Sequence, residues 1–485
     1  MSRPLPTIAS LSLALMALVT GCGDRGNDGP IRVSLIGPMP TIVNPDRIAL
    51  SASSSALLSA TAHGLVRFDG AGQIEPGLAI RWDVSDDGLY YTFRLAADTG
   101  LEADDAARLL RAAIGRASGN PLKPLFSGVD EIVAVTPEVI EIRLVAPQPN
   151  LLELLAQPEM AMLDGGVGTG PFQIAVRESS TLTLTPVVAA DDDTDQADHD
   201  RHTVKLRGER AAWGIARFAR GEAALVLNGR FQDFPLIRFA KPPPRALRRD
   251  PVAGLFGLAV VETRGFLSDP ENRRILSMTI DRDRIAAAFP DSAWRQASSL
   301  VAPGTTELGA AILPNWASLA PQIRHRIASG AVRQWIATEG APPRLRIAMP
   351  EGPGSRLLFA LLAAGWRQIG VETERVAAAA DADLRLIDAV APSDTAAWYL
   401  RRFSCPANET CSHQVTTMLD AAAKAVSAEE RTALLTRTEA MLADAVPFLP
   451  IAQPLRWSLV APRLEGFHEN PRGVHPLNHL LGEER

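Results

Sequence analysis

The sequence has few cysteines and tyrosines, with three of each in 485 residues, and it has none of the common enzyme signatures. No G-x-S-x-G or H-E-x-x-H string occurs, which removes the commonest hydrolase motifs while leaving an unusual enzyme open. The string GVGTGP lacks both the G-x-G-x-x-G spacing and the lysine of a phosphate-binding loop, and it predicts a turn. We therefore expect no enzyme, no catalytic residue and no cofactor.

The charge is nearly balanced, with 49 basic and 55 acidic residues and a net charge of -6. No basic run with interleaved aromatic residues occurs, which argues against a nucleic-acid partner. Acids and histidines gather at 191–202 and 468–479, but without the spacing of a calcium loop or a closed zinc site. We expect an acidic surface loop and a solvated tail there, and no metal site.

The N-terminus has the pattern of an export signal. Arg3 precedes an apolar stretch at 8–19, and small residues lead to Cys22. This layout resembles the bacterial lipoprotein signal, which implies removal of residues 1–21, lipidation of Cys22 and a periplasmic or cell-envelope location on a membrane. Residues 22–30 are polar and Gly-rich, so we expect them to form a flexible tether. An ordinary signal peptide or a short anchor helix remains the alternative.

The two other cysteines, Cys405 and Cys411, are separated by five residues. An oxidising compartment would favour a disulfide between them. Two free buried thiols or metal ligands stay open, although only His413 lies nearby and a single C-x5-C is poor zinc spacing.

The length favours two or three domains. Alternation and turn residues predict strands at 31–37, several strands at 61–95 and a hairpin at 131–145, with a helix at 103–117. From residue 344 the predicted order is strand, helix, strand, strand, two helices and a further strand region at 447–462. Such a β-α-β order implies a partly parallel sheet covered by helices.

Five separated stretches resemble the extracellular solute-binding proteins of peptide, dipeptide and nickel ABC importers, family 5. They are HGLVRFDGAGQIEPGLAIRWDVSDDGLYYTFRL, VGTGPF (167–172), SMTIDRDRI (277–285), RTALLTRTEAMLADAVPFLPI (431–451) and LEGFHENPRG (464–473). They occur in the order that the family has. The resemblance implies an α/β two-lobe periplasmic-binding-protein fold of type II, similar to cluster C, with an extra subdomain inserted in the first lobe.

The implied first lobe takes 31–250 and 447–485, with the inserted subdomain at about 66–163, and the second lobe takes 251–446. The prolines of KPPPRALRRDP, at 241–251, suit the linker between them. The resemblance also implies a monomer that closes on a peptide or similar small organic solute and presents it to the permease of an ABC transporter.

The candidate ligand contacts lie in VAPSDTAAWYLRRFSC, at 390–405. An ungapped count back from FSC places Asp394 on the second acid of the D-x-x-D-P motif of dipeptide-binding relatives, and Ala391 on the first. The resemblance implies that this first acid pairs with the ligand's ammonium, so Asp388 or Asp394 substitutes for it or the ligand has no free amine. Asp394 could instead cap a helix. Trp398 could be an aromatic residue of the cleft or an ordinary core residue.

Two other functions remain open. A nickel or metal-chelate ligand has only faint support from scattered histidines, and an envelope sensor or chaperone could keep the fold without transport.

Overall fold

The computed structural model describes residues 29–97, 100–187, 200–290, 292–309, 311–405 and 411–481. The expected signal peptide, Cys22 and most of the tether lie outside these residues, as does most of the acidic segment 191–202. Across the described ranges, no helix combines the length and apolarity needed to cross a membrane.

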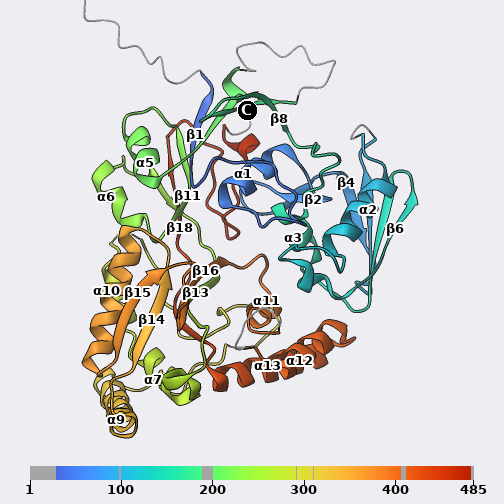
Figure 1. Ribbon diagram of the computed structural model, residues 1–485. Helices are drawn as coiled ribbons and strands as arrows, with labels where there is room; N and C mark the ends of the chain where they lie inside the picture. Colours follow the sequence, from blue (N-terminus) through green and yellow to red (C-terminus); the bar gives the residue numbers. More distant parts are fainter. Residues whose placement is uncertain are drawn as a thin grey trace, which may run out of the picture.

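The first main sheet has the strand order β12-β18-β11-β1-β10-β9-β8 among the described residues. Its strands are β1 (Ile31–Ile36), β8 (Phe172–Arg177), β9 (Leu182–Pro186), β10 (Val204–Glu209), β11 (Leu225–Arg230), β12 (Leu247–Arg249) and β18 (Arg456–Val460). β1 pairs in parallel with both β10 and β11. Helices α1 (Ala52–Thr61), α5 (Ala211–Ala219) and α6 (Ile237–Ala240) lie beside it, with the 3-10 turn η3 (Phe234–Leu236) (Figure 1).

The second main sheet has the order β15-β14-β16-β13-β17. Its strands are β13 (Gly254–Val260), β14 (Arg344–Met349), β15 (Glu372–Ala377), β16 (Leu384–Val390) and β17 (Phe448–Ala452). β14 pairs in parallel with β15 and β16, as the β-α-β pattern predicted. β13 is buried at every position because it lies inside the sheet and both faces are covered.

Helices cover the second sheet and extend below it (Figure 1). They are η4 (Gly265–Ser268), α7 (Pro270–Met278), α8 (Arg282–Ala287), α9 (Pro321–Glu339), α10 (Pro353–Gln368), α11 (Ala396–Arg401), α12 (His413–Lys424) and α13 (Ala428–Ala445). Ser412 and Ser427 cap α12 and α13 by accepting backbone N–H bonds. Cys405 and Cys411 form a disulfide just before α12, which confirms that prediction.

The inserted segment forms its own small unit with a separate hydrophobic core. Its elements are β2 (Val66–Phe68), β3 (Ile74–Pro76), β4 (Ala79–Val84), β5 (Tyr90–Leu95), α2 (Ala103–Ile114), η1 (Lys123–Phe126), β6 (Val129–Thr136), β7 (Val139–Leu144), α3 (Leu151–Leu155) and η2 (Pro158–Met160). The sheet β4-β5-β7-β6 includes the predicted hairpin of β6 and β7. α2 packs its alanine-rich face, with Leu110, onto this sheet.

The chain passes between the two main sheets twice, after β12 and after β17. The first passage lies between Arg249 and Gly254. The second lies between Ala452 and Arg456, because β17 belongs to the second sheet and β18 to the first. The strand-like stretch 447–462 conceals this change of sheet. We call the first sheet, its inserted unit and the segment 461–481 lobe I, and the second sheet with its helices lobe II.

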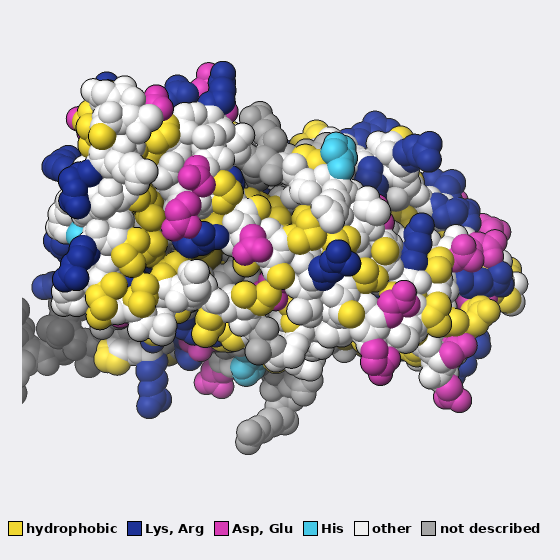
Figure 2. Space-filling view, turned by 90° about the horizontal axis from the view of Figure 1, so that it is seen from below, with side chains coloured by type: hydrophobic (Ala, Val, Ile, Leu, Met, Phe, Trp, Pro, Cys, Tyr) yellow, Lys and Arg dark blue, Asp and Glu magenta, His cyan; other side chains and the backbone are white. Residues whose placement is uncertain are grey.

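Figure 2 shows the molecule from below, where Lys and Arg side chains are interspersed with acidic and apolar ones.

Candidate functional site

A cavity of about 390 Å³ lies where lobe I, its inserted unit and lobe II meet. Its walls come from α1, η2, the end of β11, the turn from β16 to α11, the start of β18, and residues 472–475. We call it the interlobe cavity. Its volume falls in the range of sites for small organic ligands.

Asp388, one of the predicted ligand contacts, lines this cavity but already has a basic partner. Its side chain is 9% exposed, and its Oδ1 accepts a bond of 2.7 Å from Nη1 of Arg456. Nη1 of Arg230 lies 4.0 Å from the other carboxylate oxygen. One carboxylate thus faces two guanidinium groups, and Asp233 places a second carboxylate near Arg230.

Arg230 is the less neutralised of the two arginines. Its side chain is 37% exposed, and Asp388 is its ion-pair partner at 4.0 Å. Burial lowers the pKa of Arg230, and the neighbouring charge of Arg456 lowers it further, whereas Asp388 and Asp233 raise it.

Asp394 does not line the interlobe cavity; it forms part of a contact between the lobes. Its Oδ1 lies 3.0 Å from Nη1 of Arg472, whose Nη2 lies 3.0 Å from Oε2 of Glu153 on α3. Thr395, rather than Asp394, occupies the N-cap position of α11. Asp394 is therefore not the cap of α11, and Asp394 as a ligand contact stays a prediction. Ala391 lines the cavity and supplies no charge.

Two further hydrogen bonds hold residues 392–394 against the inserted unit. Gln157 donates through Nε2 to the backbone oxygen of Pro392 at 2.7 Å, and Asn150 donates through Nδ2 to Oγ of Ser393 at 3.0 Å. With the Arg472–Asp394 pair, they join lobe I directly to lobe II. The structure therefore shows the two lobes closed on the cavity.

Trp398 satisfies both of the interpretations left open by the sequence. It lines the interlobe cavity, is 9% exposed, and belongs to the hydrophobic core around α11. Its ring packs edge-to-face on Tyr399 at 4.9 Å. Trp398 is thus a core residue with one edge at the cavity wall.

The expected solvated tail at 468–479 is wrong. Asn470 is fully buried and Arg472 is 9% exposed, and Nε2 of His475 lies 3.1 Å from Oδ2 of Asp250. Nε2 of His479 lies 2.9 Å from a Glu75 oxygen. The polar composition suggested exposure to solvent. Instead, His475 and His479 pair with acids of lobe I, and Arg472 pairs with Asp394 of lobe II. The described residues contain no group of three or more His, Cys, Asp or Glu arranged to hold a metal.

Glu159, in η2, is a cavity residue that the sequence reasoning missed. It is partly buried, and no basic side chain among the described residues pairs with its carboxylate. Burial raises the pKa of Glu159. Ser55 and Ser59, one turn apart on α1, line the same cavity. The sequence around Glu159, QPEM, carries no recognisable signal.

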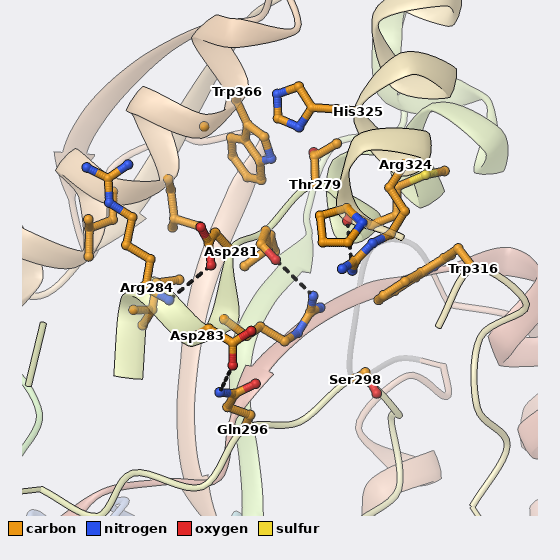
Figure 3. A pocket seen from close by; sticks show the side chains of 18 of the residues that line it. Thr279, Asp281, Asp283, Arg284, Gln296, Ser298, Trp316, Arg324, His325 and Trp366 are labelled. Carbon is orange, nitrogen blue, oxygen red and sulfur yellow. Dashed lines mark hydrogen bonds between the residues drawn. The ribbon is translucent and has the colours of Figure 1, made fainter. Parts of the chain in front are cut away.

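A second cavity, of about 510 Å³, lies inside lobe II between α8, α9 and α10 (Figure 3). The labelled acids are already engaged: Asp283 accepts from Gln296, and Asp281 caps α8. Arg282 donates through Nε to the backbone oxygen of Ala297 at 2.8 Å and lies over the ring of Trp316. These charges serve packing within lobe II, and the cavity is not between the lobes.

The family model of bacterial extracellular solute-binding proteins, family 5 Middle, matches residues 73–382, which is more than half of the chain. The chain belongs to this family. The family is one of substrate-binding proteins rather than enzymes.

Among curated relatives, the glutathione-binding protein GsiB of Salmonella typhimurium is 32% identical over 140 residues, which is 25% of this chain. The match spans 27% of that relative's length, about a quarter. GsiB of Escherichia coli K12 is 28% identical over 177 residues, covering 33% of this chain and 34% of the relative.

Among solved structures, the murein tripeptide binding protein MppA of E. coli gives a TM-score of 0.78 at 17% identity, covering 94% of this chain and 99% of that chain. The unliganded open form of MppA gives 0.62, covering 94% and 98%. Haemophilus influenzae OppA, complexed with RPPGFSPFR, gives 0.77 at 14% identity, covering 94% and all of that chain. These similarities confirm the type II periplasmic-binding-protein fold of this solute-binding protein.

Proposed function

We propose that this family 5 protein is the substrate-binding component of an ABC importer. It captures a peptide or a small organic solute of similar size in the interlobe cavity and delivers it to a membrane permease. It acts as a monomer in the periplasm or cell envelope, attached to the membrane by lipid on Cys22, and it performs no covalent chemistry.

One observation carries the proposal. The interlobe cavity is walled by both lobes, and polar contacts at 392–394 hold those lobes together around it. A solute that contacts both lobes stabilises the closed state relative to the open one, and closure is the signal that a permease can recognise. The names of relatives that bind glutathione, murein tripeptide or an oligopeptide support a peptide-like ligand.

The proposal is tested with the purified full chain and the ABC transporter that takes up its solute. We expect solute to close the lobes and the closed protein to stimulate ATP hydrolysis by the transporter. Solute binding without stimulation would instead support a sensor or chaperone. No observation on the described residues favours a metal chelate.

A further inference from the structure

We propose that the cavity inside lobe II binds a phosphate-type oxyanion through Arg324 and His325 of α9, beside the positive charge of Arg282 (Figure 3). The ligand class is inorganic phosphate or a small organic phosphate monoester. The site is separate from the interlobe cavity, because all the residues that line it belong to lobe II. The inference therefore goes beyond the proposed function and does not depend on it.

The first observation is a pair of buried nitrogen atoms. Among the described residues, Nε of Arg324 and Nε2 of His325 are shielded from solvent, and neither has a hydrogen-bond partner in the protein. Both residues line the cavity, and Figure 3 shows their side chains projecting from α9. A buried polar nitrogen without a partner carries a desolvation cost. An oxyanion in the cavity removes that cost by accepting hydrogen bonds from the guanidinium and from the imidazole when Nε2 carries a proton.

The second observation concerns Arg282, which is 8% exposed. Its guanidinium donates to backbone oxygens: Nε to Ala297 at 2.8 Å, Nη1 to Ser277 at 3.1 Å, and Nη2 to Pro450. These bonds hold the side chain in place without neutralising it, because a carbonyl oxygen has no net charge. Burial lowers the pKa of Arg282 to about 9, and the neighbouring charge of Arg324 lowers it as well.

The third observation is that Arg282 and Arg324 lie around one aromatic ring. Their Cζ atoms are 5.2 Å and 5.6 Å from the centre of the Trp316 ring, a cation-π arrangement that keeps both cations near each other. Within the part of the chain that the structure describes, neither guanidinium forms an ion pair. The two like charges repel, and an anion with more than one negative charge offsets both. Phosphate has such a charge, and its oxygens suit the donor geometry of a guanidinium.

The acids of the cavity do not supply this negative charge. Asp281 accepts from the backbone N–H of Arg284 at 3.0 Å, and Asp283 accepts from Nε2 of Gln296 at 2.8 Å. Asp281, Asp283 and Arg284 are all exposed, so water and salt screen their charges more than the charge of a buried group. α9 begins at the cavity with Pro321, and its first turn contains no acid, so the positive end of its dipole also favours an anion.

The size and lining of the cavity admit an organic group on the phosphate. The volume of about 510 Å³ exceeds that of a phosphate ion. The buried side chains of Leu362 and Trp366, on α10, form an apolar part of the wall. An apolar group esterified to phosphate therefore has surface to pack against.

The test is isothermal titration calorimetry of the full chain with sodium phosphate and, separately, with phenyl phosphate, each in sodium chloride of matched ionic strength. We expect binding of at least one of the two. Tighter binding of phenyl phosphate would assign the site to an organic monoester, and equal or tighter binding of phosphate would assign it to the free ion. Arg324→Gln should weaken the tighter ligand about 10- to 100-fold, the range of one hydrogen bond to a charged group. His325→Phe keeps a ring but removes the donor, and it should weaken the same ligand about 10-fold.

Arg326→Gln is the charge-matched control, because Arg326 is exposed on the same helix and does not line the cavity. This variant should keep the wild-type affinity. Urea unfolding without phosphate identifies the variants that are folded, and His325→Phe carries the test if Arg324→Gln does not fold. Absence of binding by both phosphate compounds, or wild-type affinity in the folded variants of the cavity, would overturn the inference. Either result would leave the proposed function standing, since capture between the lobes uses neither residue.

Discussion

Replacing Asp394 with asparagine should shift the lobes toward the open state. Asp394 lies in lobe II and its partner Arg472 in lobe I, with a separation of 3.0 Å, so this contact exists only when the lobes are closed. Asp394 does not line the interlobe cavity, and its replacement therefore removes a closing contact without removing a ligand contact.

The size of the shift follows from the exposure of the two partners. The Asp394 side chain is 53% exposed, which places the pair near surface ion pairs of about 0.2–1 kcal/mol. The Arg472 side chain is only 6% exposed, which moves the value toward the upper end because buried charges are screened less. About 1 kcal/mol corresponds to a roughly fivefold shift of the closing equilibrium toward open.

Asp105→Asn is the matched control. Asp105 lies 2.9 Å from Arg108, and both residues belong to α2 of lobe I, so their contact persists when the lobes separate. Single-molecule energy transfer between dyes at positions 178 and 339, one on each lobe, measures the open fraction. An unchanged open fraction in Asp394→Asn, or an equal shift in Asp105→Asn, would refute the reasoning.

Three further predictions concern stability. Arg456→Met should lower the free energy of unfolding, measured in urea, by about 3 kcal/mol, because the 9%-exposed Asp388 then has only Arg230, at 4.0 Å, as a basic partner. The double variant Arg456→Met with Asp388→Asn should recover part of that loss. An equal or greater loss in the double variant would contradict the charge argument. Removal of the Cys405–Cys411 disulfide by Cys405→Ala with Cys411→Ala should cost about 2 kcal/mol, since the closed loop is short; an unchanged denaturation midpoint would contradict this. Burial raises the folded-state pKa of Glu159, so the folded protein holds the proton of Glu159 to higher pH than the unfolded chain does. The free energy of unfolding of the wild type, relative to that of Glu159→Gln, should therefore fall as the pH rises from the ordinary glutamate pKa to the raised one. Parallel curves of stability against pH for the two proteins would contradict this prediction.

The sequence predicted most of the secondary structure because its signals are local. Strand alternation at 31–37 and helical spacing at 428–445 match β1 and α13. The change of sheet between β17 and β18 was not predictable in this way, since both strands are almost entirely buried and lie within one strand-like stretch. Their assignment depends on pairing with β13 and β11, which are about 190 and 230 residues away in the chain.

The site was harder to predict because its charges are paired over long distances. The sequence proposed Asp388 and Asp394 as ligand contacts, and it could not show that the fold pairs Asp388 with Arg456 and Asp394 with Arg472. The segment 468–479 contains polar residues that suit solvent, yet folding buries Asn470 completely. Glu159 stands out only once the partners of the other cavity acids are known.

Native mass spectrometry of the full protein, purified without denaturation, tests solute capture most directly. The account predicts a co-purified peptide or similar small solute, displaced when the interlobe cavity is blocked by Ala391→Trp. A solute that remains bound to Ala391→Trp, and is lost instead when the cavity beside Trp316 is filled, would contradict capture between the lobes.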